Sequence, residues 1–310
     1  MPFRKDETLE NIFINNKNTP FIFIRPGGNW GDELIYWGAE HLAESVGLNW
    51  RSEDIGNFNP ERVLPSEAIY LHGGGGFNSW CSGNAALALK NALTSPARLV
   101  VQGPQTFDNS DEYISNLVRE IISLPTRKEI FIFSRERNSL DLLHELLPAH
   151  IDYGLDIDTA LHLTKEIFLE RTGKIKPRYD FIALREDNEA AINATLNKKG
   201  VTLDPSLYAS SFDHWLRIHA AARSIVTNRT HSSVAGAILG TPTVLLAGSY
   251  HKNKSIWEYS LKERGVGWGE YDQNEKMDKN NFLYDLLPNR VKHSWKIQTI
   301  SNWLKGVPLP

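Results

Sequence analysis

The feature that most constrains the fold is a series of short apolar runs, rich in β-branched and aromatic residues. They are predicted to be buried strands, and they occupy Phe21–Ile24, Ala68–Leu71, Leu99–Val101, Ile130–Phe133, Phe181–Leu184, Ser224–Thr227 and Thr243–Leu246. Segments with helical spacing lie between them, as at Asp32–Val46, Asp111–Leu124, Ser139–Leu147 and Phe212–Arg223. Because parallel strands need a long connection, which is usually a helix, this alternation predicts an α/β fold with parallel sheets.

The length of the chain favours two domains. At 310 residues it exceeds a comfortable single core. The segment Glu170–Arg178 contains Gly173, Pro177 and four cationic side chains, and it interrupts the alternating pattern. We therefore expect an N-terminal domain over residues 1–172 and a C-terminal domain over residues 177–310, with a terminal helix at His293–Lys305 that packs back on the N-terminal domain.

Composition excludes several functional classes. There are 34 Lys+Arg against 37 Asp+Glu, so the formal charge is −3, and no dense basic run offers a footprint for nucleic acid. The single cysteine, Cys81, excludes an internal disulfide and fits a reducing compartment. No apolar run reaches the ~18 residues of a transmembrane helix or forms a signal peptide. We expect a cytoplasmic protein, with peripheral contact at the inner face of the membrane as an option.

Polar residues follow each predicted strand. The carboxyl ends of parallel strands meet at one edge of the sheet, where ligands bind. The residues that follow the seven runs are, in order, Asn29 with Gly31 and Asp32, then Gly73–Gly76, Gln105, Arg135, Arg185, Arg229 with His231, and Lys252 with Asn253. Four consecutive glycines exceed what a tight turn needs, so Gly73–Gly76 are predicted to form a loop that is open to a substrate. Asp32 is either a base or a helix cap.

The pair Arg229 and His231 is the most informative. It lies after a strand and at the start of a predicted helix. A guanidinium fork suits phosphate and carboxylate groups, and an anion bound beside an imidazole favours the protonated ring, which can then act as a general acid. Arg185 supplies a second guanidinium after another strand. In the alternative interpretation Thr230 caps the helix and His231 is a hydrogen-bonded core residue.

The order of these motifs resembles the polysaccharide pyruvyl transferase family over nearly the whole chain. The motifs are Asn29-Trp30-Gly31-Asp32, Gly73–Gly76, Gln102-Gly103-Pro104, Ser134-Arg135-Glu136, Arg229-Thr230-His231 and Tyr250-His251-Lys252-Asn253. Two departures are the short form of the third motif, which many relatives carry as Gln-Gly-x-Gly-Pro, and Ser232-Ser233, where small apolar residues are usual.

The resemblance implies two Rossmann-like domains facing across a cleft, as in GT-B glycosyltransferases. It also implies phosphoenolpyruvate as co-substrate, a glycan or lipid-linked sugar as acceptor, and neither a metal nor a cofactor. The chemistry of ketal formation assigns catalysis to His231, Arg229 and Asp32, and donor binding to Arg185, Arg229, Lys252, Asn253 and Arg135. Acceptor binding is assigned to Asn29, Gly31, Gly73, Gly74, Gly75 and Gln105.

Two other functions remain open from the sequence. A GT-B glycosyltransferase that uses a nucleotide sugar would share the fold and place the same cations on a diphosphate. A non-catalytic protein that binds a glycan or a phosphate would keep the fold without turnover.

Overall fold

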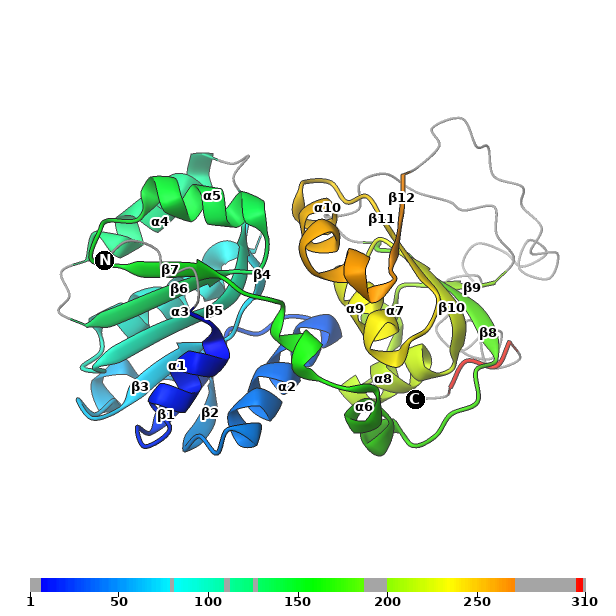
Figure 1. Cartoon of the computed structure of the whole chain (residues 1–310), viewed down its shortest axis with the longest axis horizontal. Helices are drawn as coiled ribbons and strands as arrows, with labels where there is room; N and C mark the ends of the chain where they lie inside the picture. Colours follow the sequence, from blue (N-terminus) through cyan, green and yellow to red (C-terminus); the bar gives the residue numbers. More distant parts are fainter. Residues whose placement is uncertain are drawn as a thin grey trace. The chain divides into compact units, whose positions relative to one another are not determined.

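The computed structural model describes residues 7–78, 81–108, 112–124, 128–186, 200–270 and 305–308. The chain divides into two compact units. The first unit contains Met1–Leu163 and Tyr250–Ser260, and the second contains Thr164–Ser249 and Leu261–Pro310. Each unit has a sheet in which every strand pair is parallel. The predicted α/β class with two Rossmann-like units is confirmed (Figure 1).

The first unit is built on a sheet with strand order β2-β1-β3-β5-β6-β7, and β4 pairs with β5. Its strands are β1 (Phe21–Arg25), β2 (Trp50–Asp54), β3 (Ala68–Leu71), β4 (Gly74–Phe77), β5 (Leu99–Phe107), β6 (Glu129–Ser134) and β7 (Asp152–Leu155). Its helices are α1 (Leu9–Asn15), α2 (Trp30–Ser45), α3 (Ser82–Thr94), α4 (Glu112–Ile122), α5 (Arg137–Leu146) and α10 (Lys252–Ile256), with 3-10 turns at Pro60–Arg62 and Thr159–His162.

Strand β1 shows how the two faces of this sheet are covered. Successive side chains of a strand point to opposite faces. Phe21 and Phe23 pack in one buried cluster with residues of α1 and α2, whereas Ile22 and Ile24 pack in another with residues of α3, α4 and α5. Both faces are therefore buried under helices, which is why the strand is an unbroken apolar run.

The second unit has a smaller sheet with strand order β12-β11-β10-β8-β9. Its strands are β8 (Tyr179–Ala183), β9 (Val201–Leu203), β10 (Ala222–Thr227), β11 (Thr243–Leu246) and β12 (Gly267–Gly269). Its helices are α6 (Lys165–Thr172), α7 (Pro205–Tyr208), α8 (Phe212–Ala220) and α9 (Thr230–Leu239). A π-helical turn at Trp257–Leu261 and a 3-10 turn at Lys262–Arg264 precede β12.

All seven predicted strands are present, and five further strands were not predicted. The prediction of an open loop at Gly73–Gly76 is wrong in part, because Gly74–Phe77 forms β4. The glycine at position 73 has a packing reason, since a Cβ there would lie 2.0 Å from the carbonyl oxygen of Pro104. The remaining unpredicted strands are short or polar, as Trp50–Asp54 and Val201–Leu203 illustrate.

Two helix boundaries in the second unit bear on the expected domain organisation. Helix α6 continues to Thr172, inside the expected linker, and ends at Gly173, whose φ of 75° suits glycine. Helix α8 ends at Ala220 because β10 begins two residues later. The expected terminal helix falls on residues 293–304, which lie outside the described residues, and on Lys305. Close to the chain end, His214 Nε2 donates to the carbonyl oxygen of Pro308 at 2.9 Å.

In the part of the chain that the structure describes, the helices lack the combination of length and apolar character that crossing a membrane requires.

A buried histidine makes the stability of the second unit depend on pH. His219 is 0% exposed, its Nδ1 donates to the carbonyl oxygen of Trp215 at 2.8 Å, and its Nε2 accepts from Ser232 Oγ at 3.0 Å. Burial lowers its pKa from 6.5 to about 4. The unfolded chain therefore binds a proton that the folded chain excludes, so stability is complete above about pH 6.5 and falls toward pH 4.

We predict that this histidine removes about 2 kcal/mol of unfolding free energy between pH 7 and pH 5. The variant His219→Gln keeps an acceptor for Ser232 and lacks the titration, so it should lose about that much less over the same interval. Urea unfolding at the two pH values measures both proteins. Identical pH dependence in the two proteins would contradict the assignment.

Candidate functional site

The carboxyl ends of three adjacent strands bring charged residues together in the second unit. Arg185 follows β8, Asp204 follows β9 and Arg229 follows β10. The strands lie in the order β10-β8-β9, so the three residues occupy neighbouring positions at one sheet edge. This is the edge at which ligands bind in open parallel sheets.

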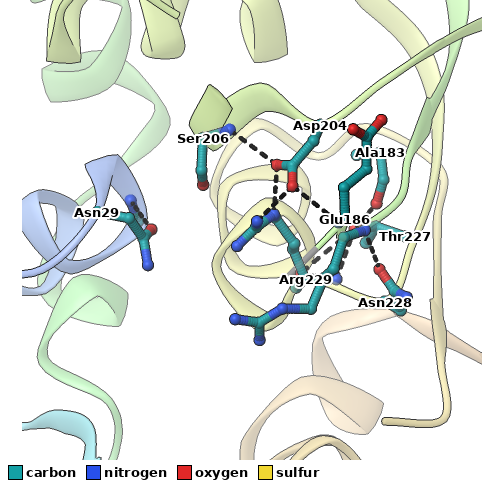
Figure 2. Close-up of polar contacts among 10 residues, drawn as sticks. Asn29, Ala183, Glu186, Asp204, Ser206, Thr227, Asn228 and Arg229 are labelled. Atoms are coloured by element: carbon teal, nitrogen blue, oxygen red, sulfur yellow. Dashed lines mark hydrogen bonds and ion pairs between the residues drawn. The ribbon is translucent and has the colours of Figure 1, made fainter. Parts of the chain in front are cut away.

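A bidentate ion pair forms the centre of this cluster (Figure 2). Arg229 donates from Nε to Asp204 Oδ1 at 2.6 Å and from Nη2 to Asp204 Oδ2 at 2.5 Å. Arg229 is 6% exposed and Asp204 is 4% exposed. The carboxylate also accepts the amides of Ser206 at 3.0 Å and Glu186 at 3.1 Å. Two parallel charge-assisted bonds fix the plane of the guanidinium as well as its position.

Side chains also tie the backbones of the two arginines together. The amide of Arg185 donates to Asn228 Oδ1 at 2.8 Å. The amide of Arg229 donates to Thr227 Oγ1 at 2.9 Å, and that hydroxyl donates to the carbonyl oxygen of Ala183 at 2.7 Å. These hydrogen bonds thus join the ends of β8 and β10 next to the backbones of Arg185 and Arg229.

His231 is the second residue of α9 and is half-buried. The interpretation in which Thr230 caps this helix is wrong, because Arg229 occupies the N-cap position and Thr230 is the first helical residue. The first amides of a helix have no intrahelical acceptor, and the helix dipole favours an anion at this end. The imidazole therefore lies in the first turn of a helix suited to an anionic ligand, two residues from a fixed guanidinium.

In the first unit, two cations lie beside the glycine run. A Cβ at Gly75 would lie 3.3 Å from Arg135 Nη2 and 3.5 Å from Lys252 Nζ. Arg135 is 1% exposed, and it donates from Nη1 to Asp158 Oδ2 at 2.6 Å and from Nε to Thr106 Oγ1 at 2.9 Å. Glycine at position 75 lets the backbone approach both cations.

The segment after β11 leaves the second unit and packs on the first. His251 Nε2 lies 3.5 Å from Glu136 Oε1, and Ser255 Oγ donates to Asn138 Oδ1 at 2.9 Å. Lys252 and Asn253 are 7% and 2% exposed. The structure therefore places Lys252, Asn253 and Arg135 in the first unit, and Arg185, Arg229 and His231 in the second.

Three of the residues that are expected to contact the acceptor, Asn29, Gly31 and Asp32, lie at the start of α2. Asn29 Oδ1 accepts the amide of Gly31 at 2.8 Å, and Asp32 Oδ2 accepts the amide of Asn29 at 2.8 Å. Asp32 is thus the reciprocal half of a capping box. Its other oxygen, Oδ1, lies 3.6 Å from the position of a Cβ at Gly74.

Gln105 lies within β5 and is 2% exposed. Its Nε2 donates to the carbonyl oxygen of Thr106 at 3.0 Å and lies 3.9 Å from the position of a Cβ at Gly76. Gly73, Gly74 and Gly75 come directly before Gly76 in the chain. Within the first unit, the glycine run therefore lies close to Asp32, to the cations of Arg135 and Lys252, and to Gln105.

The sequence did not predict Asp204 and Asp158, which pair with the two buried arginines of the candidate site. Asp204 is the N-cap of α7 and stands before Pro205 at the first helical position. An Asp-Pro pair after a short apolar run is a helix-start signal that marks a strand end. The run Val201–Leu203 is only three residues long, so the strand before it carried little signal.

We predict that Gly28→Ala destabilises the first unit by about 1–3 kcal/mol. Gly28 has φ of 149°, and a Cβ there would lie 2.3 Å from Asp32 Oδ2, so the substitution strains the backbone and displaces the capping box. The control is Gly83→Ala in the first turn of α3, where a Cβ would meet nothing within 4 Å. Chemical denaturation should show the control unchanged or more stable, and equal effects would contradict the account.

Comparison with known proteins identifies the fold and the family of the chain. The crystal structure of the functionally uncharacterised protein KP1_0663 from Klebsiella pneumoniae subsp. pneumoniae NTUH-K2044 matches with a TM-score of 0.61 and 19% identity, over 84% of this chain and 96% of that one. This likeness shows the fold. No curated protein matches the chain. The family model described as polysaccharide pyruvyl transferase matches residues 29–250, well over half of the sequence. The chain therefore belongs to the polysaccharide pyruvyl transferase family.

Proposed function

We propose that this protein transfers the enolpyruvyl unit of phosphoenolpyruvate onto two sugar hydroxyls of a polysaccharide or its precursor to form a pyruvate ketal, with release of phosphate. The observation that carries the proposal is the fixed guanidinium of Arg229, two residues before His231 at the start of α9. This arrangement offers a guanidinium suited to an anion and an imidazole two residues later at the start of the same helix. Family membership supports the same reaction class.

The reaction needs one proton delivered to carbon and one leaving group. The methylene carbon of phosphoenolpyruvate accepts a proton and becomes a methyl group, which leaves an oxocarbenium-like carbon. Two hydroxyl oxygens bond to that carbon, the bond to the phosphate oxygen breaks, and inorganic phosphate leaves. The two hydroxyl protons balance the step, since one restores the acid and the other leaves with the phosphate.

The second unit supplies the acid and the main donor contacts in this proposal. His231 is the general acid, which contributes typically 10²–10⁴-fold to rate. Arg229 and Arg185 hold the phosphate and carboxylate of the donor, because guanidinium forks match both groups. Lys252, Asn253 and Arg135 of the first unit are proposed as further donor contacts.

The first unit supplies the acceptor contacts in this proposal, through Asn29, Gly31, Gln105 and Gly73, Gly74 and Gly75. Asp32 is proposed to accept a hydroxyl proton through Oδ1, because Oδ2 is engaged by the amide of Asn29. The acceptor is a glycan, free or lipid-linked. We place the reaction in the cytoplasm, in keeping with the single cysteine of the chain.

Saturating phosphoenolpyruvate is expected to stabilise the protein against heat. A ligand at ~100 times its dissociation constant adds ~2.7 kcal/mol, which raises the midpoint by several degrees in units of this size. Nucleotides and nucleotide sugars serve as the parallel panel in the same thermal-unfolding assay. A shift with a nucleotide sugar and none with phosphoenolpyruvate would replace the proposal with a GT-B glycosyltransferase.

The variant His231→Gln is expected to bind phosphoenolpyruvate within about threefold of wild type while losing at least ~100-fold in turnover, because it lacks only the transferable proton. Phosphate release in the presence of a glycan acceptor measures turnover, and calorimetry measures binding. His144→Gln, on the outer side of α5, is the control and should keep full activity. Undiminished turnover in His231→Gln would remove that residue from the mechanism, and wild type that binds without turning over any acceptor would indicate a binding protein.

A further inference from the structure

A single carboxylate connects the ends of three strands in the second unit. Asp204, directly after β9, accepts four hydrogen bonds: two from the Arg229 side chain, one from the Ser206 amide and one from the Glu186 amide. Figure 2 shows these contacts converging on its two oxygens. Neither the family match nor the motifs of the chain assign this residue a role.

We propose that Asp204 is a positioning residue for the donor, acting through the guanidinium of Arg229. The inference rests on the proposed function, in which Arg229 binds phosphoenolpyruvate. Asp204 holds the edge of the guanidinium formed by Nε and Nη2. The five N–H groups lie in one plane, so fixing that edge also fixes the direction of the edge that includes Nη1. A donor anion then meets a preset fork and does not have to order a mobile side chain.

The geometry exceeds what a structural clip of the sheet edge needs. The ends of β8 and β10 are already joined by the bonds from Arg185 to Asn228 and from Thr227 to Ala183, so Asp204 is not needed to hold those two strands together. A buried ion pair contributes little net stability compared with apolar residues of similar volume, although removing one partner alone is costly. Both charges are almost fully buried, and the pair defines one orientation of the guanidinium. The ion pair therefore fixes the orientation of the Arg229 guanidinium, in addition to holding the strand ends together.

The same carboxylate also accepts a bond from the residue next to Arg185. The Glu186 amide that Asp204 accepts belongs to the residue directly after Arg185, whose own amide is held by Asn228. The Arg185 amide is held independently by Asn228, so the effect of Asp204 on donor binding is expected to run through the Arg229 side chain.

A double-mutant cycle tests the proposal. Phosphoenolpyruvate is titrated by calorimetry into wild type, Asp204→Asn, Arg229→Gln and the double variant, each checked for cooperative thermal unfolding. If Asp204 acts through Arg229, Asp204→Asn weakens binding at least tenfold in wild type and by less than twofold when Arg229 is already replaced. Asp204→Glu keeps the charge but moves the carboxylate by one methylene. If Asp204→Asn fails to fold, the same cycle is measured with Asp204→Glu, and the same criteria apply.

The outcomes distinguish a failure of the positioning role of Asp204 from a failure of phosphoenolpyruvate as the donor. Equal losses in both backgrounds, or a loss below twofold in a folded variant with Arg229 intact, would overturn the positioning role. The cycle is repeated with inorganic phosphate as the probe. If wild type binds phosphate with the coupling described and does not bind phosphoenolpyruvate, the positioning role stands and the proposed donor falls. Wild type that binds neither overturns both.

Discussion

Parallel strand pairing is the constraint on which the rest of this structure depends. In the described residues every strand pair is parallel, so within each sheet the carboxyl ends of the strands gather at one edge. In the first unit both faces of the sheet are covered by helices, which favours apolar inner strands such as β1 and β3 and leaves many polar residues to the segments that follow. The concentration of arginines, amides and glycines at the strand ends is a consequence of that topology.

Both units bury an arginine at a sheet edge and pair it with an aspartate. Each contains a buried arginine within two residues of the end of an inner strand, Arg135 after β6 and Arg229 after β10. Each arginine is held by an aspartate that follows the adjacent or next-but-one strand, Asp158 in the first unit and Asp204 in the second. Paired charges can be buried where isolated charges cannot, because the partner offsets much of the desolvation cost. The result in each unit is a buried guanidinium that is held in one orientation.

Much of the fold could be predicted from the sequence, because buried parallel strands are compact apolar runs. Phe21–Ile24 and Ile130–Phe133 are examples that the structure extends by a residue or two. Val201–Leu203 and Gly267–Gly269 are strands of three residues, too short for periodicity to distinguish them from loops. The glycine strand β4 has no strand propensity of its own and exists because its backbone pairs with β5.

The site was predictable by residue type but not by partnership. Residues after strands identified Arg229 and Arg135, yet the aspartates that hold them come from other strand ends, and pairing over 23 or 25 positions leaves no local pattern. The sequence also did not indicate that Lys252 belongs to the first unit. It follows β11 of the second unit in sequence, and only the docking of His251 and Ser255 near the start of α5 places it in the first unit.

The central claim is that the held guanidinium of Arg229 is the anchor of a phosphoenolpyruvate site. The most direct measurement is a crystal structure of the protein with phosphoenolpyruvate bound. The account predicts a phosphate or carboxylate oxygen of the donor at about 2.7–2.9 Å from Arg229, with the Asp204 pair intact and the methylene carbon facing His231. Donor density that makes no contact with Arg229, or an Arg229 that leaves Asp204 to bind the donor, would contradict it.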